Sequence, residues 1–217
     1  MKLYTYYRSS AAYRVRIALN LKGLTYESLP RHLSRGGGEH RSADYLALNP
    51  QGLVPVLEHD GAILTQSLAI IEYLEETHPE PPLLPGTPLL RARARSLALA
   101  IACDIHPLNN LRVLNYLRAP LHLEATLIDD WYRHWIACGF AALEAEAARA
   151  PGDQKHLVGT SVTLADVCLV PQMFNARRFG CDLEPYPTLR AISTHLEGLA
   201  AFARAAPEAQ PDAPGSP

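Results

Sequence analysis

The chain has 217 residues, of which 48% are hydrophobic and 19% charged, a composition typical of a soluble globular enzyme and not of a disordered chain. Its formal net charge is −2, so no large basic field is available to attract nucleic acid. No apolar run approaches the roughly 18 residues that a membrane-spanning helix needs, and the N-terminus lacks the apolar core of a signal peptide. We therefore predict a cytoplasmic protein whose partners include neither nucleic acid nor a membrane.

The first half of the chain alternates strand-like and helix-like segments, with a triple glycine between two of them. The predicted elements are a strand at 3–7, a helix at 11–22, a strand at 25–29, a loop at 36–38, a short helix at 43–48, strands at 54–58 and 62–65, and a helix from Gln66–Ser67. We expect Ala69, Ile70 and Leu74 on the core face of that last helix. The order βαβ followed by ββα predicts an α/β thioredoxin-like domain.

Five prolines in the stretch from Pro79 to Pro88 exclude a helix and predict a stiff linker. Beyond the linker the chain is rich in Ala and Leu and predicts an all-α domain. The predicted helices span 90–102, 107–117, 121–150, 164–179 and 189–206. Thr163 and Asp166 have the spacing of a capping box with a structural role. The proline-rich tail from Pro207 is expected to fray. The predicted organisation is thioredoxin-like domain 1–82, linker 83–89, helical domain 90–210 and tail 211–217.

The four cysteines lie far apart and no two form a CxxC pair, which argues against a zinc site or a dithiol redox site. Each lies in an apolar stretch, so we expect buried free thiols in a reducing compartment, and no bound metal. They are Cys103, Cys138, Cys168 and Cys181.

The turn between the first strand and the first helix carries Arg8, Ser9 and Ser10. Free backbone N–H groups and the positive end of the helix dipole favour an anion there, and Arg8 adds a cation. Because this turn has no cysteine, the anion must come from a bound molecule. Arg14 and Arg16, further along the helix, are interpreted as structural or solvent-facing.

Several motifs, in this order and at this spacing, resemble the zeta class of glutathione transferases, and bacterial maleylacetoacetate isomerases above all. The likeness extends over nearly the whole chain, to about Pro211. The motifs are Arg8–Ser10 with Arg14–Leu19, Asn49–Pro55, Gln66–Leu74, Asp104–Arg112 and Thr163–Asp166.

The resemblance implies the two-domain glutathione transferase fold, a homodimer, and glutathione as the cofactor. It implies a cis Val54–Pro55 bond that lets Val54 pair with the peptide backbone of glutathione. Gln66 and Ser67 would hold the γ-glutamyl carboxylate, although Ser67 alone is also typical of a helix cap. His106 is either a cap or a surface residue, or a contact to the cofactor. The residues assigned to glutathione are Ser9, His40, Val54, Gln66, Ser67, His106 and Asn110.

The resemblance also implies the chemistry, in which a glutathione thiolate adds to the cis double bond of a maleyl group and leaves after the bond has rotated. Ser9 would lower the pKa of the thiol by donating a hydrogen bond to the sulfur, with Ser10 as the alternative. The substrate is a small dicarboxylate, which suits the bidentate fork of arginine. Arg8, Arg112 and Arg178 are the candidates for binding it, and Arg177 is the alternative to Arg178.

The expected reaction is the isomerisation of maleylacetoacetate in tyrosine and phenylalanine catabolism. Alternatives are the isomerisation of maleylpyruvate in the gentisate pathway, and a general transferase that detoxifies haloacids or other electrophiles. A non-catalytic protein of this fold is disfavoured because Ser9, Gln66 and Ser67 are all present. Ala11 stands where many zeta relatives carry a cysteine, which argues against reductive dehalogenation.

Overall fold

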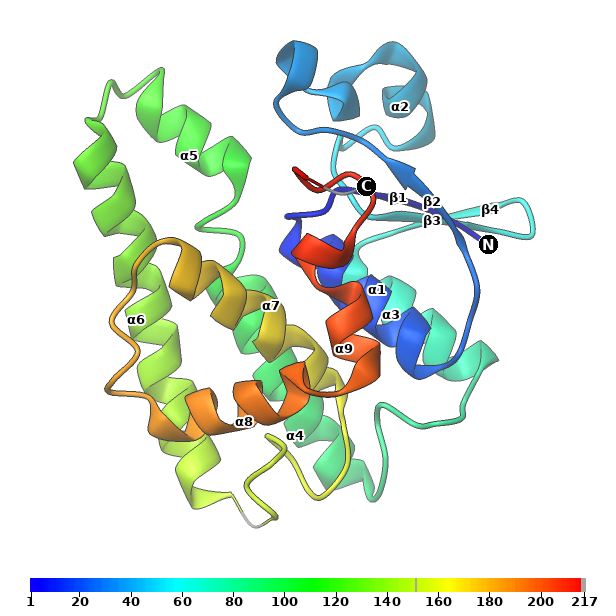
Figure 1. Ribbon diagram of the computed structural model, residues 1–217, viewed down its shortest axis with the longest axis vertical. Helices are drawn as coiled ribbons and strands as arrows, with labels where there is room; N and C mark the ends of the chain where they lie inside the picture. The colour runs from blue at the N-terminus through cyan, green and yellow to red at the C-terminus, as the bar shows by residue number, and fades with distance from the viewer. Residues whose placement is uncertain (151, 216–217) are drawn as a thin grey trace. The chain divides into compact units, whose positions relative to one another are not determined.

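The computed structural model describes residues 1–150 and 152–215, which form two compact units (Figure 1). The first unit comprises Met1–Pro82 together with the chain from Gly198 onward, and the second comprises Leu83–Glu197. Residues 216 and 217 of the predicted tail lie outside the described residues. No helix among the described residues combines the length and the apolar character that crossing a membrane requires.

The first unit is built on a four-stranded sheet in the order β2-β1-β3-β4, in which only the β1–β2 pair is parallel. This mixed sheet and its helices confirm the predicted thioredoxin-like layout. Its elements are β1 (Lys2–Thr5), α1 (Ser10–Leu21), β2 (Glu27–Pro30), η1 (Arg35–Gly37), η2 (Glu39–Arg41), α2 (Ala43–Leu48), β3 (Val56–His59), β4 (Ala62–Thr65), α3 (Ser67–Thr77), α9 (Ala200–Ala205) and η4 (Pro207–Ala209).

The core of the first unit has a part on each face of the sheet. Leu3 and Leu57 are paired across β1 and β3 and are fully buried. Helices α1 and α3 pack side by side (Figure 1) and bury Ile70, Ile71 and Leu74 from α3. Because strand side chains alternate, Val56 lies on the opposite face from Leu57, and it packs there in an apolar cluster with a tyrosine of α2. The prediction that Ala69 faces the core is wrong, since Ala69 is exposed and Ile71 is buried instead.

The second unit is all-helical, as predicted. Helix α7 runs through its centre, with 12 of its 15 residues buried, and packs against α4 and α8. The elements are α4 (Pro88–Leu99), the π-helical turn η3 (Ala100–Ile105), α5 (Leu111–Arg118), α6 (Ala125–Arg149), α7 (Leu164–Arg178) and α8 (Pro187–Glu197). Helix α5 begins later than predicted because residues 107–110 form turns and the Asn110 side chain caps the helix.

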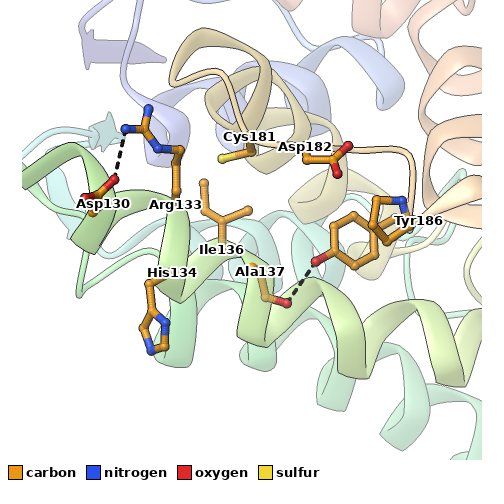
Figure 2. A pocket seen from close by; sticks show the side chains of 9 residues that line it. Asp130, Arg133, His134, Ile136, Ala137, Cys181, Asp182 and Tyr186 are labelled. Atoms are coloured by element: carbon orange, nitrogen blue, oxygen red, sulfur yellow. Dashed lines mark hydrogen bonds and ion pairs between the residues drawn. The ribbon is translucent and has the colours of Figure 1, made fainter. Parts of the chain in front are cut away.

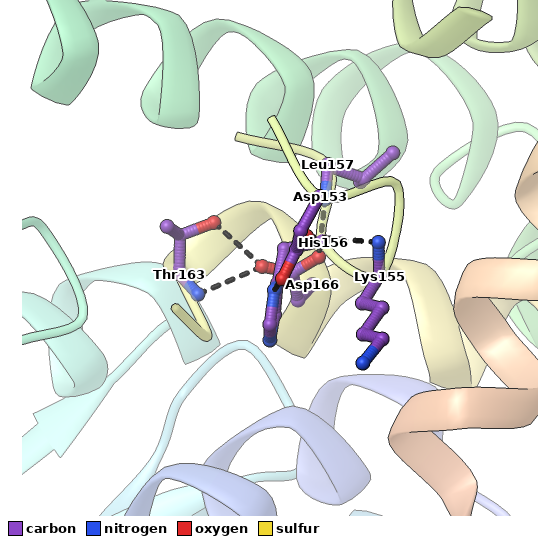
Figure 3. A network of polar contacts seen from close by, with 6 residues as sticks. All are labelled: Asp153, Lys155, His156, Leu157, Thr163 and Asp166. Carbon is purple, nitrogen blue, oxygen red and sulfur yellow. Dashed lines mark hydrogen bonds and ion pairs between the residues drawn. The ribbon is translucent and has the colours of Figure 1, made fainter. Parts of the chain in front are cut away.

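The N-terminus of α7 is organised by Asp166, which is fully buried (Figure 3). Its carboxylate accepts hydrogen bonds from the N–H and the hydroxyl of Thr163 and from the N–H of Leu157, each at 2.8 Å. These contacts confirm the predicted capping box. Burial raises the pKa of Asp166, and the three hydrogen bonds oppose that rise because they favour the charged form.

The predicted helix at 189–206 is two helices that belong to different units. Helix α8 ends at Glu197, and α9 packs on α1 of the first unit. The Asn20 side chain of α1 donates to the carbonyl of Ala201 at 2.9 Å. The helical unit therefore ends at Glu197, whereas the sequence pattern predicts a helical domain that runs to residue 210.

The expected fraying of the tail is wrong for its described part. Pro207 and Gln210 are buried, and the Gln210 amide donates to the carbonyls of Arg204 and Ala206, each at 2.9 Å. The prolines end the helix but do not loosen the chain, because a buried side chain ties the turns that follow to α9.

All four cysteines are free thiols, as predicted, but their expected burial is only partly confirmed. Cys168 is buried, because it lies on the central helix α7. Cys103 and Cys138 are exposed, so for them the expectation is wrong. In the described ranges, no three His, Cys, Asp or Glu side chains gather as a metal site would require.

Candidate active site

Ser9 is the N-cap residue of α1, and its hydroxyl oxygen accepts a hydrogen bond from the N–H of Ala12 at 3.2 Å. A hydroxyl that accepts one bond keeps its proton for donation to another group. Ser10 begins the helix and is only 5% exposed, whereas Ser9 is only partly covered. Of the two serines, Ser9 is therefore the more accessible residue.

The turn before Ser9 is held by Arg16, which is fully buried. Its guanidinium donates to the Thr5 hydroxyl at 3.0 Å, to the carbonyls of Tyr6 and Tyr7 at 3.2 and 2.9 Å, and to the carbonyl of Ala205 at 3.0 Å. Burial lowers the pKa of Arg16 to about 10, which leaves the side chain charged at neutral pH. Arg16 therefore joins the end of β1 to α9 through one cation.

Arg8 lies beside this turn against two aromatic side chains. Its guanidinium carbon is 5.9 Å from the ring centroid of Tyr6 and 5.4 Å from that of Tyr7, and one nitrogen donates to the Tyr6 hydroxyl at 3.3 Å. The side chain is half-buried. These contacts orient the cation close to the N-terminus of α1.

The Val54–Pro55 peptide bond is cis, as the resemblance implied. The carbonyl of Leu53 accepts hydrogen bonds from the Tyr45 hydroxyl at 2.7 Å and from the Asn49 amide at 2.8 Å. Burial raises the pKa of Tyr45, so its hydroxyl stays a donor. These two hydrogen bonds therefore fix the backbone directly before Val54.

Gln66 and Ser67 stand at the start of α3 in an unusual backbone conformation. Gln66 has φ +68°, a left-handed value that costs free energy for a residue other than glycine and that is frequent at functional sites. Its amide donates to the Gln51 side chain at 3.0 Å. The Ser67 hydroxyl lies 3.4 Å from a guanidinium nitrogen of Arg14. The helix N-terminus and this buried cation make the spot suitable for a carboxylate.

Neither Arg14 nor Arg16 faces solvent, since they are 1% and 0% exposed. The structural interpretation is therefore confirmed and the solvent-facing one is wrong for both, although their contacts near Ser9 and Ser67 were not predicted. A signal was available, because both arginines lie in an otherwise apolar helical stretch, where a charged residue needs buried partners.

His40 is 5% exposed, and its Nδ1 atom is buried with no hydrogen-bond partner among the described residues. Burial, together with the nearby charge of Arg41, lowers the pKa of His40. Gly38, at φ +104°, passes so close that a Cβ there would lie 2.5 Å from the imidazole Cε1. The loop therefore holds a neutral imidazole with one ring nitrogen still to be satisfied.

The remaining predicted residues lie in the second unit. The N–H of His106, at the end of η3, donates to the Ile101 carbonyl at 2.9 Å. The Asn110 side chain accepts from the N–H of Arg112 at 3.0 Å, and Arg112 is exposed. Asn110 therefore has a structural role as the cap of α5.

The two adjacent arginines at the end of α7 differ in their contacts. Arg177 lies 2.6 Å from the carboxylate of Glu197 and 3.4 Å from the Ser193 hydroxyl. The guanidinium carbon of Arg178 instead lies 4.7 Å from the ring centroid of Phe179. Arg177 is thus engaged with α8.

A pocket with a volume of about 430 Å³ lies between α6 and the loop that follows α7 (Figure 2). None of the predicted site residues lines it. Arg133 pairs there with Asp130 at 3.2 Å, and the Tyr186 hydroxyl donates to a carbonyl of α6 at 3.2 Å. Burial raises the pKa of the Cys181 thiol, which keeps it protonated. The pocket therefore has no visible part in the expected chemistry.

Comparison with known proteins shows likeness in both units. A family model of the glutathione S-transferase N-terminal domain matches residues 3–82, and one of the C-terminal domain matches residues 138–199. A protein of Vibrio cholerae named probable maleylacetoacetate isomerase is 54% identical over 211 residues, which are 97% of this chain and 97% of the relative.

Two solved structures are similar over almost their whole length. One is the holo structure of a maleylpyruvate isomerase described as a bacterial glutathione S-transferase of the zeta class, with a TM-score of 0.95 and 49% identity over 98% of this chain and 100% of that one. The other is the maleylacetoacetate isomerase of Methylobacterium extorquens AM1 with bound malonate and glutathione, with a TM-score of 0.94 and 44% identity over 99% and 100% of the two chains.

Proposed function

Because the chain belongs to the zeta class of the glutathione transferase family, we propose that it is a glutathione-dependent cis–trans isomerase that converts maleylacetoacetate to fumarylacetoacetate. This step belongs to tyrosine and phenylalanine catabolism. The proposal rests on the turn, held by Arg16, that places Ser9 at the N-terminus of α1. The chain is also 54% identical to a probable maleylacetoacetate isomerase.

Groups in the first unit fit the parts of glutathione. The N-terminus of α3, with Gln66, Ser67 and the cation of Arg14, suits the γ-glutamyl carboxylate. The backbone of Val54 pairs with the peptide groups of the tripeptide. The buried, unsatisfied Nδ1 of His40 suits a polar partner at the glycyl end. In the second unit, His106 and Asn110 are the proposed further contacts to the cofactor.

Ser9 activates the thiol in this proposal. Its hydroxyl donates to the sulfur, and the positive end of α1 together with Arg8 favours the thiolate, so each lowers the pKa of the thiol. When bound, glutathione supplies the thiolate that adds to the maleyl double bond and leaves after its rotation. The greater accessibility of Ser9 supports it over Ser10 as the donor.

Arginines bind the two carboxylates of the substrate. Arg8, Arg112 and Arg178 are proposed for this role because a guanidinium binds a carboxylate bidentately. Arg177, the alternative to Arg178, is engaged in an ion pair with Glu197. The Methylobacterium extorquens relative was solved with malonate, a dicarboxylate, together with glutathione.

Maleylpyruvate is the alternative substrate, favoured by the likeness to a maleylpyruvate isomerase with a TM-score of 0.95. The chemistry is the same and the substrate is shorter. Turnover of both compounds by the purified protein separates the two isomerase reactions. Turnover of haloacids or neutral electrophiles at a higher rate than either maleyl compound would instead indicate a general transferase.

The function is tested by measuring isomerisation of maleylacetoacetate with and without glutathione. We expect turnover only with glutathione and a one-to-one complex by isothermal titration. Ser9→Ala should lower kcat by about 10- to 1000-fold, the scale of losing one preorganised donor, with little change in glutathione Kd. Ser10→Ala is the matched control. A loss in Ser10→Ala alone would reassign the donor, and absence of glutathione binding at millimolar concentration would refute the proposal.

We further propose that the protein is cytoplasmic, as its composition predicts, and that it is a homodimer, as the resemblance to the zeta class implied. Light scattering at micromolar concentration should give twice the mass of one chain. A monomeric mass would contradict this assembly without affecting the proposed reaction.

A further inference from the structure

The C-terminal segment, residues 198–215, ends in a contact with the turn that carries Ser9. The carboxylate of Asp212 accepts a hydrogen bond from the N–H of Tyr7 at 2.9 Å. Its other oxygen, Oδ1, is buried and has no hydrogen-bond partner among the described residues. A half-satisfied carboxylate is costly to bury, so its position beside this turn needs an explanation.

The C-terminal segment that carries Asp212 is held in place by its own contacts. Helix α9 packs on α1, and the Gln210 side chain is 6% exposed and bonded to two carbonyls of the same segment. The N–H of Ala213 donates to the Gln210 carbonyl at 3.0 Å, which closes a turn around Asp212. The carboxylate is therefore presented at a fixed place and not by a loose chain end.

Arg16 and Asp212 both form hydrogen bonds to the peptide groups of the turn. Arg16 donates to the carbonyl of Tyr7 at 2.9 Å, while Asp212 accepts from the N–H of the same residue. The carbonyl of Tyr6 accepts from Arg16 at 3.2 Å and from the N–H of Ser9 at 2.9 Å. The attraction of Asp212 opposes the fall that burial causes in the pKa of Arg16. The buried Arg16 cation and the half-buried Asp212 carboxylate thus fix the backbone on both sides of Tyr7.

We propose that Asp212 is a positioning residue, which holds the Tyr7 peptide so that the hydroxyl of Ser9 is directed at the sulfur of bound glutathione. This inference rests on the role of Ser9 in the proposed function. Asp212 acts through the backbone and touches neither the thiol nor the substrate. A displacement of about 1 Å at a donor can cost a large part of its effect, so the contact need not be close to the reacting atoms to influence the rate.

Loss of Asp212 should shift the pKa of the bound thiol in opposite directions, depending on whether Asp212 positions Ser9 or acts only through its charge. Removing a nearby negative charge favours the thiolate and lowers the pKa of bound glutathione. Letting the Ser9 hydroxyl drift removes a hydrogen bond to the thiolate and raises that pKa. The other charges around the turn, Arg8, Arg14 and Arg16, are the same in every variant compared, so the sign of the shift identifies the role.

The experiment is a pH titration of the thiolate absorbance of glutathione bound to wild type, Asp212→Ala, Asp212→Asn and Glu208→Ala. In Asp212→Ala we expect the pKa of the bound thiol to rise by about one unit and kcat to fall about tenfold, with glutathione Kd nearly unchanged. Asp212→Asn keeps an oxygen that can accept from Tyr7 and should restore most of the wild-type pKa. Glu208 is exposed on the same segment, so Glu208→Ala removes the same charge and should change nothing.

An unchanged or lowered thiol pKa in Asp212→Ala overturns the proposal, even if that variant melts at a lower temperature, because a merely structural residue changes Tm alone. Should Asp212→Ala fail to fold, Asp212→Ser replaces it, since its side chain is polar but too short to reach Tyr7. The titration needs only bound glutathione. A wild type that binds glutathione but isomerises neither maleyl compound therefore refutes the proposed function while Asp212 is still tested, and a wild type that binds none refutes both.

Discussion

Arg16 in the first unit and Asp166 in the second are both fully buried charges with several hydrogen bonds, yet they connect very different stretches of chain. The partners of Asp166 lie within nine residues of it. One partner of Arg16 lies 189 residues away. Asp166 stabilises the N-terminus of α7, whereas Arg16 joins the C-terminal segment to the turn that carries Ser9.

A buried charge serves the fold or the site according to which segments of the chain it joins. Asp166 closes a loop onto its own helix, so its loss damages one unit locally. Arg16 joins two carbonyls just before Ser9 to α9, so its loss changes both packing and the geometry of a proposed donor. Variants at the two residues should therefore separate stability from activity.

The largest expected effect is on stability, in Asp166→Ala. The substitution leaves the N–H groups of Thr163 and Leu157 buried without their acceptor, so we expect the free energy of unfolding to fall by about 3–5 kcal/mol. Urea unfolding measures this loss, and the pKa of bound glutathione in the protein that remains folded should not change. Asp153→Ala is the control: it removes a partly exposed carboxylate of the same loop, bonded to Lys155 and His156, and should have a smaller effect than Asp166→Ala. A wild-type free energy of unfolding in Asp166→Ala would show that the buried carboxylate does not stabilise the helical unit.

Arg16→Lys should cost about 2–4 kcal/mol, because an ammonium has three donors and lacks the fork that reaches four acceptors. Unlike Asp166→Ala, it should also lower kcat, since the carbonyls of Tyr6 and Tyr7 lose the hydrogen bonds from Arg16. Unfolding curves and initial rates on the same samples test this, with Arg204→Lys on the exposed side of α9 as the control. Reduced stability with an unchanged kcat would show that Arg16 does not position Ser9.

The same contrast explains what the sequence could predict. The Thr163–Asp166 capping box depends on a three-residue spacing and was predicted from it, whereas the cis bond before Pro55 was implied by the resemblance to the zeta class. The contacts of Arg16 with Ala205 and of Asp212 with Tyr7 depend on how distant segments fold back, which no local pattern records. For that reason the order of the elements was predicted well, and the ordered C-terminal segment was not.

In the second unit, the proposed substrate residues are exposed arginines, which should affect rate without affecting stability. Arg112→Ala leaves one substrate carboxylate unpaired and should lower kcat/KM for maleylacetoacetate by about 5- to 150-fold. Arg178→Ala should behave similarly, and neither should slow conjugation of an uncharged electrophile. Arg177→Ala is the matched control, since it removes a neighbouring arginine that contacts Glu197 and Ser193 of α8. Equal activity of Arg112→Ala and wild type on both substrate types would make Arg112 a solvated helix residue.

The smallest expected effect is a loss of stability at high pH, to which both units contribute. Burial raises the pKa of Tyr45 in the first unit and of Tyr132 in the second above the ordinary value of 10.0. As pH rises through that value, the unfolded chain loses these protons before the folded protein does, so the free energy of unfolding should fall above pH 10. Below pH 10 both states keep the protons and the two groups cause no slope. Urea unfolding at a series of pH values should show a shallower fall in Tyr132→Phe than in wild type, whereas Tyr116→Phe, at a tyrosine that is 59% exposed, should match wild type. Identical slopes in Tyr132→Phe and wild type would mean that this phenol ionises equally easily in the folded and unfolded chains.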